Sequence, residues 1–247
     1  MTIDLACSPT TMKTLGLIGG IGPESTIDYY RMLIARYRER ANGEYPSIII
    51  NSIDLDRLLR WMTANELGKA ADYVSLEIER LYKAGADFAA LASNTPHIVF
   101  DELERRSKLP LFSIVEAVCQ KVQALGFNTV ALLGTRFTMQ ASFYQNVFAR
   151  AGIRLETPNV EEQFLIHDKY INELLNNIFS SETKSRILAI VNDLKERHDI
   201  QAVILGGTEL PLLLKDEEHN GLPLIDTSKV HVDVLVDEML KQVKIVD

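Results

Sequence analysis

Four short turns of this 247-residue sequence gather glycines, hydroxyls and ionisable groups that could handle a small polar ligand. The turns contain, in order, Gly20, Ile21, Gly22 and Pro23; Ser93, Asn94, Thr95 and His97; Thr135 and Thr138; and Gly207, Thr208 and Glu209. Glycines permit close backbone approach, and a proline at a helix start is followed by free N–H groups that can hold an anion. The residue types therefore indicate anion binding.

The polar side chains of these turns have two competing roles. Asn and Thr beside a helix start commonly cap that helix, and they can also donate hydrogen bonds to a carboxylate. His97 and Glu209 stand in matching turns, and an imidazole or carboxylate serves as a general base when its pKa lies near the working pH. Asn51 joins the candidate site because it ends an apolar run of the same kind. Convergence of these turns would favour a small-carboxylate site over capping alone.

Nucleotide binding is a further reading of the glycine-rich turn. A dinucleotide fingerprint requires the spacing Gly-x-Gly-x-x-Gly, and Ser25 stands where the third glycine would be. A nucleotide-binding enzyme is therefore the least supported of the functions considered.

Composition excludes several classes of partner. The net charge of -8 and the pI of about 5.2 give no basic footprint for nucleic acid. The two cysteines, Cys7 and Cys119, show neither a metal-type spacing nor a disulfide framework, which indicates a reducing compartment. The N-terminus lacks the pattern of a signal peptide, and no apolar run approaches the roughly 18 residues of a membrane span. We expect a cytoplasmic protein without a membrane partner.

Short apolar runs alternate with longer amphipathic stretches along the chain. The predicted strands are Thr14–Ile18, Ser47–Asn51, Phe88–Ala92, Leu111–Ser113, Thr129–Leu133, Ala202–Leu205 and Leu224–Ile225. The predicted helices are Thr26–Ala41, Asn65–Ala84, Ile114–Leu125, Gln140–Ala151, Glu162–Asn176, Thr183–Arg197 and Val230–Val243. Continuous apolar runs are typical of buried parallel strands, so the alternation predicts an α/β fold with helix-covered parallel sheets. Ligands of such sheets bind outside the carboxyl ends of the strands, where the four turns fall.

Two segments repeat at nearly equal spacing. Ser93 lies 74 positions after Gly19, and Gly207 lies 73 positions after Gly134. This spacing predicts two similar lobes from a duplication. The first lobe is placed at residues 12–109 plus 227–247 and the second at 110–226, after a flexible extension at 1–11.

Six segments in the same order resemble the aspartate/glutamate racemase family. They are GLIGGIGPEST (family GGMGP), SNTPH (family CNTxH), LLGTRFTM, EEQFLIHDKYINELLNNIF, GGTEL (family GCTEL) and DTSKVHVDVLVDEML. The resemblance implies two pseudo-symmetric α/β lobes with an active site in the cleft between them. It also implies an amino-acid substrate, no cofactor, no metal and a homodimer. Matching family histidines fall at His167 and His231, whose simplest role is structural.

The resemblance breaks at the two positions that carry the family's chemistry. There, one cysteine from each lobe faces opposite sides of the substrate Cα, one removing the proton and the other returning it. Ser93 and Gly207 stand at those positions. A serine hydroxyl is a far weaker acid than a thiol and needs a neighbour to activate it, and glycine can transfer no proton. Cys119 lies on a helix core stripe, so it does not replace them.

Three functions follow from this conflict. The first is an amino-acid racemase or isomerase for a small acidic substrate, working in impaired, one-sided or altered form. The second is a catalytically silent protein that binds a small carboxylate. The third is a lyase or isomerase that uses His97 or Glu209.

Overall fold

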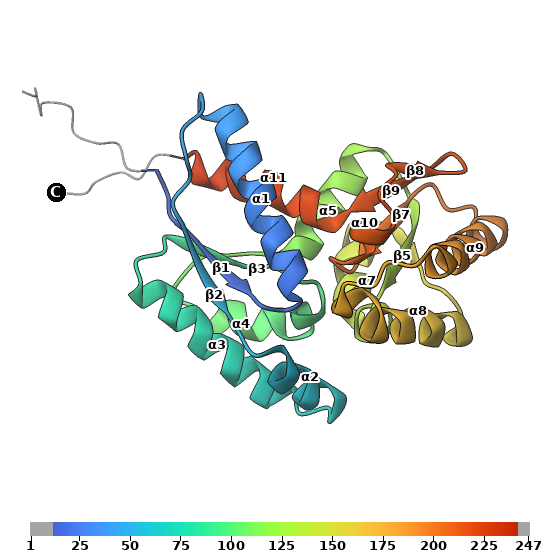
Figure 1. Cartoon of the computed structure of the whole chain (residues 1–247), viewed down its shortest axis with the longest axis horizontal. Coiled ribbons are helices and arrows are strands. Elements are labelled where there is room, and N and C mark those ends of the chain that lie inside the picture. The colour runs from blue at the N-terminus through green and yellow to red at the C-terminus, as the bar shows by residue number, and fades with distance from the viewer. Residues whose placement is uncertain (1–11, 242–247) are drawn as a thin grey trace, which may run out of the picture.

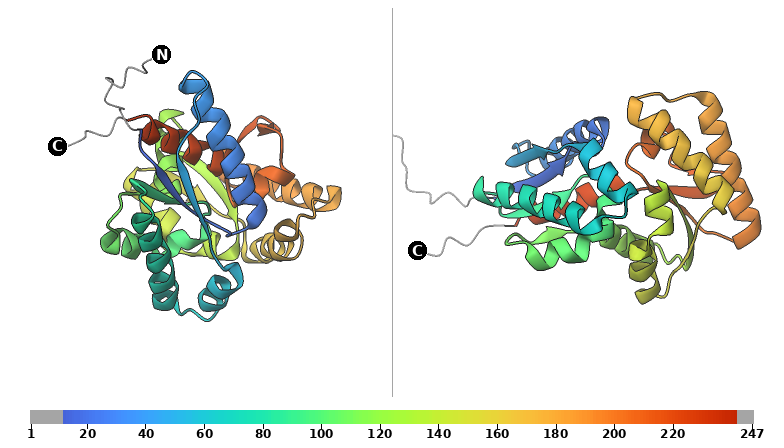
Figure 2. Two further views of the ribbon diagram at one scale, coloured as in Figure 1. Left: turned by 60° about the vertical axis from the view of Figure 1, so that its left-hand side comes forward. Right: turned by 90° about the horizontal axis from the view of Figure 1, so that it is seen from below.

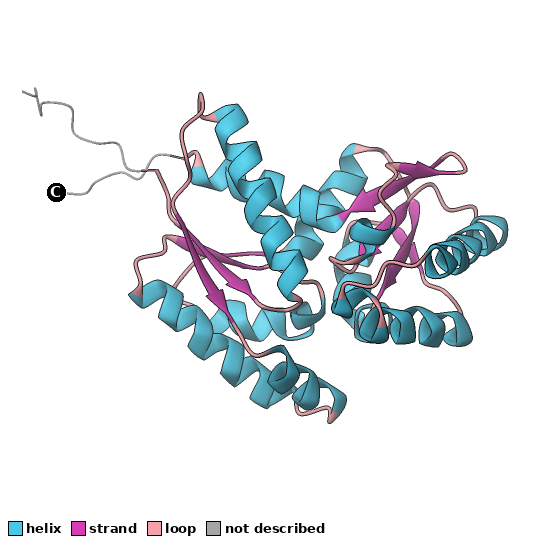
Figure 3. Cartoon of the chain, viewed as in Figure 1, coloured by secondary structure: helices cyan, strands magenta, loops and turns pink. Residues whose placement is uncertain are grey.

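The structure of the protein, a computed structural model, describes residues 12–241 and shows two α/β lobes (Figure 1). In each lobe helices flank a central sheet of mostly parallel strands (Figure 3). The expected extension at 1–11 and the last residues of the expected closing helix lie outside the described residues. No helix within 12–241 is both long and apolar enough to cross a membrane.

The first sheet has the strand order β2-β1-β3-β4. Its strands are β1 (Leu15–Gly19), β2 (Ile48–Ser52), β3 (Phe88–Leu91) and β4 (Leu111–Phe112). The helices that follow them are α1 (Pro23–Arg40), α2 (Leu55–Thr63), α3 (Leu67–Lys83), the 3-10 helix η1 (Thr95–Val99) and α4 (Phe100–Arg106). One face of the sheet packs on α2, α3 and α4, and the other on α1 and the closing helix α11 (Thr227–Met239).

The second sheet has the order β6-β5-β7-β9-β8. Its strands are β5 (Thr129–Gly134), β6 (Arg154–Glu156), β7 (Val203–Gly206), β8 (Glu218–His219) and β9 (Leu222–Asp226), of which β8 is antiparallel. Its helices are α5 (Ile114–Ala124), α6 (Arg136–Gln140), α7 (Ser142–Arg150), α8 (Val160–Asn172), η2 (Leu174–Asn176), α9 (Ser181–His198) and α10 (Leu210–Leu213). α5 and α7 cover one face, whereas α8, α9 and α10 cover the other.

The two lobes share one topology and exchange one helix each. The order β2-β1-β3-β4 corresponds strand for strand to β6-β5-β7-β9, as a duplication predicts. Helix α5 follows β4 of the first sheet but packs in the second lobe. Helix α11 follows β9 of the second sheet but packs in the first lobe, where Figure 1 and Figure 2 show it beside α1. The sequence predicts that the second lobe starts at Pro110, but β4 still pairs with β3 of the first sheet. The chain therefore passes to the second lobe only after β4.

The predicted strands and long helices match the observed ones to within about three residues, with two exceptions. The predicted helix Glu162–Asn176 is divided into α8 and η2, and the closing helix ends at Met239, before the predicted Val243. The sequence missed the short elements β6, β8, α2, α4, α6 and α10. All of them except α2 have at most seven residues, too few for a periodic pattern to stand out. Helix α1 begins earlier than its apolar pattern because Pro23 is well suited to the first helical turn.

Candidate active site

The turns that follow β1, β3, β5 and β7 meet in a small cavity between the lobes. The cavity measures about 20 Å³ and is lined by Ile21, Gly22, Leu55, Leu58, Leu59, Met62, Ser93, Thr95, Thr135, Phe137, Tyr170, Ile171, Leu175 and Glu209. This is room for about one water molecule. The four turns singled out in the sequence therefore do converge, and α2 and α8 complete the wall.

Tyr170 of α8 fills the space that a side chain on Gly207 would occupy. A Cβ built at Gly207 would lie 2.7 Å from the Tyr170 hydroxyl oxygen and 2.9 Å from its Cζ atom. Tyr170 is buried in the core of the second lobe. The second lobe thus lacks a thiol at this position and places a phenol in the space beside it. Sequence reasoning missed Tyr170, because Ile166, Tyr170 and Leu174 read as an ordinary core stripe of a helix.

The carboxyl group of Glu209 is the ionisable group at the centre of the cavity wall. Its Oε2 atom accepts hydrogen bonds from the hydroxyls of Tyr170 and, at 3.1 Å, Thr208. Its Oε1 atom accepts one from the hydroxyl of Ser25 in α1, across the lobe boundary. Burial raises the pKa of Glu209, although these hydrogen bonds to the carboxylate oppose that rise. A carboxylate whose pKa is raised is a stronger base than a solvent-exposed one.

Ser93 faces the same cavity from the end of β3, in the other lobe. Within residues 12–241, no hydrogen bond joins its hydroxyl to an imidazole or a carboxylate. An unactivated serine hydroxyl remains protonated near neutral pH and is a poor base. The two faces of the cavity are therefore chemically unequal, with a carboxyl group on one side and an inert hydroxyl on the other.

Three threonine hydroxyls form a hydrogen-bonded cluster at the lobe boundary. The Oγ1 atoms of Thr95 and Thr135 are 3.1 Å apart, and that of Thr138 lies 3.4 Å and 3.2 Å from them. Thr135 also caps α6, because its hydroxyl oxygen accepts the backbone N–H of Thr138. Thr95 and Thr135 line the cavity, whereas Thr138 stands behind them. Hydroxyls can turn to donate to a carboxylate, so the cluster is the candidate carboxylate anchor.

Asn94 connects the lobes instead of lining the cavity. Its side-chain carbonyl accepts the Tyr144 hydroxyl at 2.6 Å, and its amide donates to the hydroxyl of Thr227 at 3.1 Å. Thr227 in turn donates to the backbone carbonyl of Leu205, two residues before Gly207. This buried chain holds the Ser93 and Gly207 turns in a fixed relation.

Gly20, Pro23 and Asn51, which the sequence also placed in the site, lie outside the cavity wall. Gly20 supports the turn with a φ of 82°, and its N–H donates to the Thr26 hydroxyl at 2.8 Å. Pro23 starts α1 on the exposed side. The Asn51 amide donates to the carboxylate of Glu77 at 2.8 Å.

His97 is buried away from the cavity and stacks on Phe100 with ring centroids 4.8 Å apart. Its Nε2 atom accepts the backbone N–H of Ile114 at 3.3 Å. Burial, with a smaller effect of His231, lowers the pKa of His97 to about 3, so the ring is neutral near pH 7. Of the two candidate bases, only Glu209 lines the cavity.

No lysine, arginine or histidine side chain lines the cavity among the residues that the structure describes. Three basic residues stand next to wall residues in the sequence and contact other groups. Arg57 stacks on Trp61 and Tyr73, Lys169 pairs with Glu173, and Arg136 lies over the rings of Phe137 and Phe164. Nor does the described part of the chain gather three or more His, Cys, Asp or Glu side chains in a metal-binding group.

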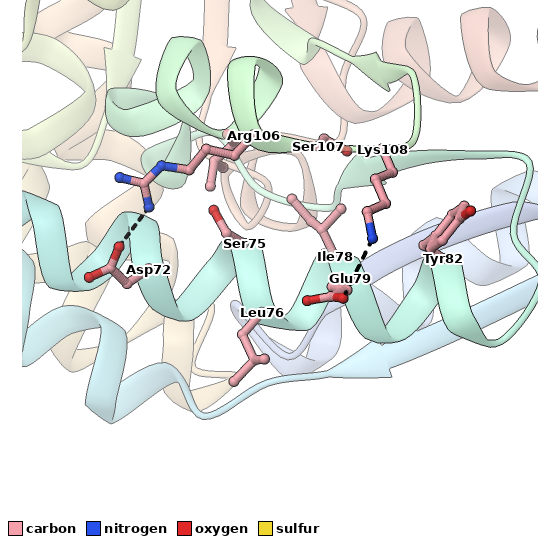
Figure 4. A pocket seen from close by; sticks show the side chains of 10 residues that line it. Asp72, Ser75, Leu76, Ile78, Glu79, Tyr82, Arg106, Ser107 and Lys108 are labelled. Carbon is pink, nitrogen blue, oxygen red and sulfur yellow. Dashed lines mark hydrogen bonds and ion pairs between the residues drawn. The ribbon is translucent and has the colours of Figure 1, made fainter.

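A larger hollow of about 340 Å³ lies between α3 and α4, on the outside of the first lobe (Figure 4). Its charges are paired: Arg106 lies 2.6 Å from Asp72, and Lys108 lies 3.9 Å from Glu79. It holds none of the predicted site residues, so its size alone does not make it the active site.

Comparison with known proteins agrees with this fold. A family model described as Asp/Glu/hydantoin racemase matches residues 18–235. RacX, a broad specificity amino-acid racemase of Bacillus subtilis (strain 168), is 26% identical over 230 residues, which cover 87% of this chain and 92% of RacX.

Solved structures show the same relationship. PH1733, an aspartate racemase homologue from Pyrococcus horikoshii OT3, is 32% identical with a TM-score of 0.77, and the match covers 93% of this chain and 100% of PH1733. A Yersinia pestis protein provisionally assigned as an Asp/Glu racemase is 31% identical with a TM-score of 0.84, over 93% of this chain and 100% of that one. The chain therefore belongs to the Asp/Glu/hydantoin racemase family.

Proposed function

We propose that this protein activates the Cα–H bond of an amino acid on one face only, with Glu209 as the acid–base group, so that it exchanges the α-proton with solvent without inverting the centre. The observation that carries the proposal is the placement of Glu209. Its carboxyl group lines the inter-lobe cavity, its pKa is raised by burial, and three hydroxyls fix its orientation. It stands beside Gly207, the position at which the resemblance would place the second thiol.

Each neighbouring residue has a separate role in this proposal. The carboxylate of Glu209 takes the proton from the substrate Cα and returns it to the same face. Tyr170, Ser25 and Thr208 hold the carboxylate in place, because all three hydroxyls donate to it. The hydroxyls of Thr95 and Thr135 would hold the substrate carboxylate. The resemblance extends the proposal to a homodimer that works without a cofactor, and the cysteine usage extends it to the cytoplasm.

One-sided proton transfer makes a specific prediction about stereochemistry. Because Ser93 has no activating partner within residues 12–241, only one face of the substrate meets a usable base. In D2O the Cα–H of one enantiomer should exchange for deuterium with retention of configuration. The other enantiomer should exchange far more slowly.

The test is NMR of the Cα–H signal with separate L- and D-amino acids, followed by chiral analysis of the product. Glu209→Gln should abolish exchange, because an amide cannot accept the proton. Glu79→Gln, on the exposed side of α3, is the matched control and should exchange at the wild-type rate. Exchange that persists in Glu209→Gln would overturn the proposal.

A catalytically silent binding protein is the second candidate. The observation that favours it is the filled space beside Gly207, where Tyr170 leaves no room for a second catalytic side chain. Saturable binding of an amino acid without exchange of either enantiomer would support this candidate and exclude the first.

A further inference from the structure

We infer that the substrate carries an uncharged, apolar side chain, so that the site rejects aspartate and glutamate. This inference rests on the proposed function for the chemistry, but its basis is the wall of the cavity, which can be tested by binding alone.

The wall opposite the polar turns is apolar. Helix α2 contributes Leu55, Leu58, Leu59 and Met62, and Phe137 and Leu175 close the cavity from the second lobe. Leu58 and Met62 are fully buried there. A substrate that enters this space places its side chain against hydrocarbon, which favours an aliphatic group because each buried CH2 is removed from water.

The charges at the cavity oppose an acidic side chain. No cationic side chain lines the cavity within the described residues, and the acidic side chain on its wall there is the carboxyl of Glu209. A substrate with a single carboxylate can use the threonine hydroxyls as its anchor. A second carboxylate would be buried without a counter-ion and close to Glu209, which is strongly unfavourable.

Helix α2 is the part of the wall that we expect to move when such a substrate enters. The cavity holds about 20 Å³ in this structure, so an amino acid requires the wall to move outward. α2 is a nine-residue helix that supplies the largest share of the apolar wall from one element. Leu59 lies half-buried at its outer edge, where the cavity meets the surface beside Arg60. Leu59 is therefore the wall position at which a new charge would disturb the fold least.

Leucine, asparagine and aspartate are the ligands that test the inference. Their side chains share one branched shape and differ in polarity and charge, so the comparison isolates the chemistry of the wall. Binding is measured by thermal stabilisation and calorimetry on the wild-type full chain, with each enantiomer, because exchange with retention leaves the ligand unchanged. We expect leucine to bind at least about a hundredfold more tightly than aspartate, with asparagine between them.

A charge introduced into the wall provides the converse test. Leu59→Lys should improve aspartate binding by roughly threefold to fivefold, the range of a partly exposed ion pair, and weaken leucine binding. Leu76→Lys, a change of the same kind at an exposed site of α3, should alter neither affinity. A melting temperature within a few degrees of wild type shows that both variants are folded.

The outcomes separate this inference from the proposed function. Leucine binding without Cα–H exchange supports the apolar site and contradicts the proposed function. Exchange of aspartate or glutamate at a rate equal to or above that of leucine overturns the apolar site and leaves one-sided proton transfer standing. Failure of leucine to bind any form of the protein also overturns the apolar site.

Discussion

Restoring a thiol at Gly207 tests how the cavity is built, because Tyr170 occupies the space that the new side chain needs. The Cβ of Gly207→Cys would lie 2.7 Å from the Tyr170 hydroxyl oxygen and 2.9 Å from Cζ, well inside ordinary contact. Gly207 is not in the left-handed region, so the cost is steric and not conformational. Overpacking of this kind costs about 1–3 kcal/mol. Moving the Tyr170 ring also removes a hydrogen bond from buried Glu209, at about 1–3 kcal/mol more.

The assay is urea unfolding of single and double variants. Gly207→Cys should lower the free energy of unfolding by about 2–6 kcal/mol, by the sum of those two effects. Ser93→Cys, the near-isosteric change in the other lobe, should cost less than about 1.5 kcal/mol. In a Tyr170→Ala background the Gly207→Cys change should become nearly neutral, whereas Tyr170→Phe keeps the ring and should keep the steric cost. An equal cost in the wild-type and Tyr170→Ala backgrounds would refute this reasoning.

Three further predictions concern the buried groups around the cavity. Burial lowers the pKa of His231 to about 4, so the native state binds fewer protons than the unfolded state below pH 6.5. This difference contributes about 3 kcal/mol to the free energy of unfolding above pH 6.5, and the contribution is lost as the pH falls toward 4. His231→Gln should flatten that decline in urea titrations. Tyr144→Phe leaves the carbonyl of Asn94 without its donor and should cost about 1–3 kcal/mol in the same assay; a change below about 0.3 kcal/mol would contradict the inter-lobe role of this bond. Gly20→Ala should lower the free energy of unfolding by more than about 3 kcal/mol, because its Cβ would lie 2.6 Å from the carbonyl oxygen of Ile53 at a φ of 82°. The Cβ of Gly43→Ala meets nothing within 4 Å, so this control should cost only the strain of its backbone, about 1–2 kcal/mol. Equal losses of the two variants in thermal unfolding would contradict this difference.

The lobes and the meeting of the turns could be predicted from the sequence for simple physical reasons. Continuous apolar runs such as Leu15–Gly19 and Val203–Gly206 form parallel strands because both faces of the sheet are covered. The carboxyl ends of parallel strands lie at one edge, so Ser93 and Glu209 had to come near that edge. The equal spacing of the two repeats extended this argument to both lobes.

The filling of the cavity could not be predicted in the same way. Tyr170 follows the spacing of core residues on α8, and only the packing of that helix against the sheet at β5 directs its hydroxyl to Glu209. Helix α2 offered a signal that was passed over: Asp54 caps it, and Leu55, Leu58, Leu59 and Met62 recur at helical spacing. Because α2 is short and closely follows β2, its apolar residues are hard to separate from the end of the strand. These residues form the apolar wall of the cavity.

The central claim is that Glu209 alone transfers the proton, and isotope incorporation with chiral analysis measures it directly. In D2O, the wild-type protein should place deuterium at Cα of one enantiomer of leucine while the configuration is retained. The rate should rise as the pH passes upward through the raised pKa of Glu209, because the carboxylate form is the base. Glu209→Gln should incorporate none. Equal formation of both enantiomers by the wild-type protein, or undiminished incorporation in Glu209→Gln, would contradict the claim.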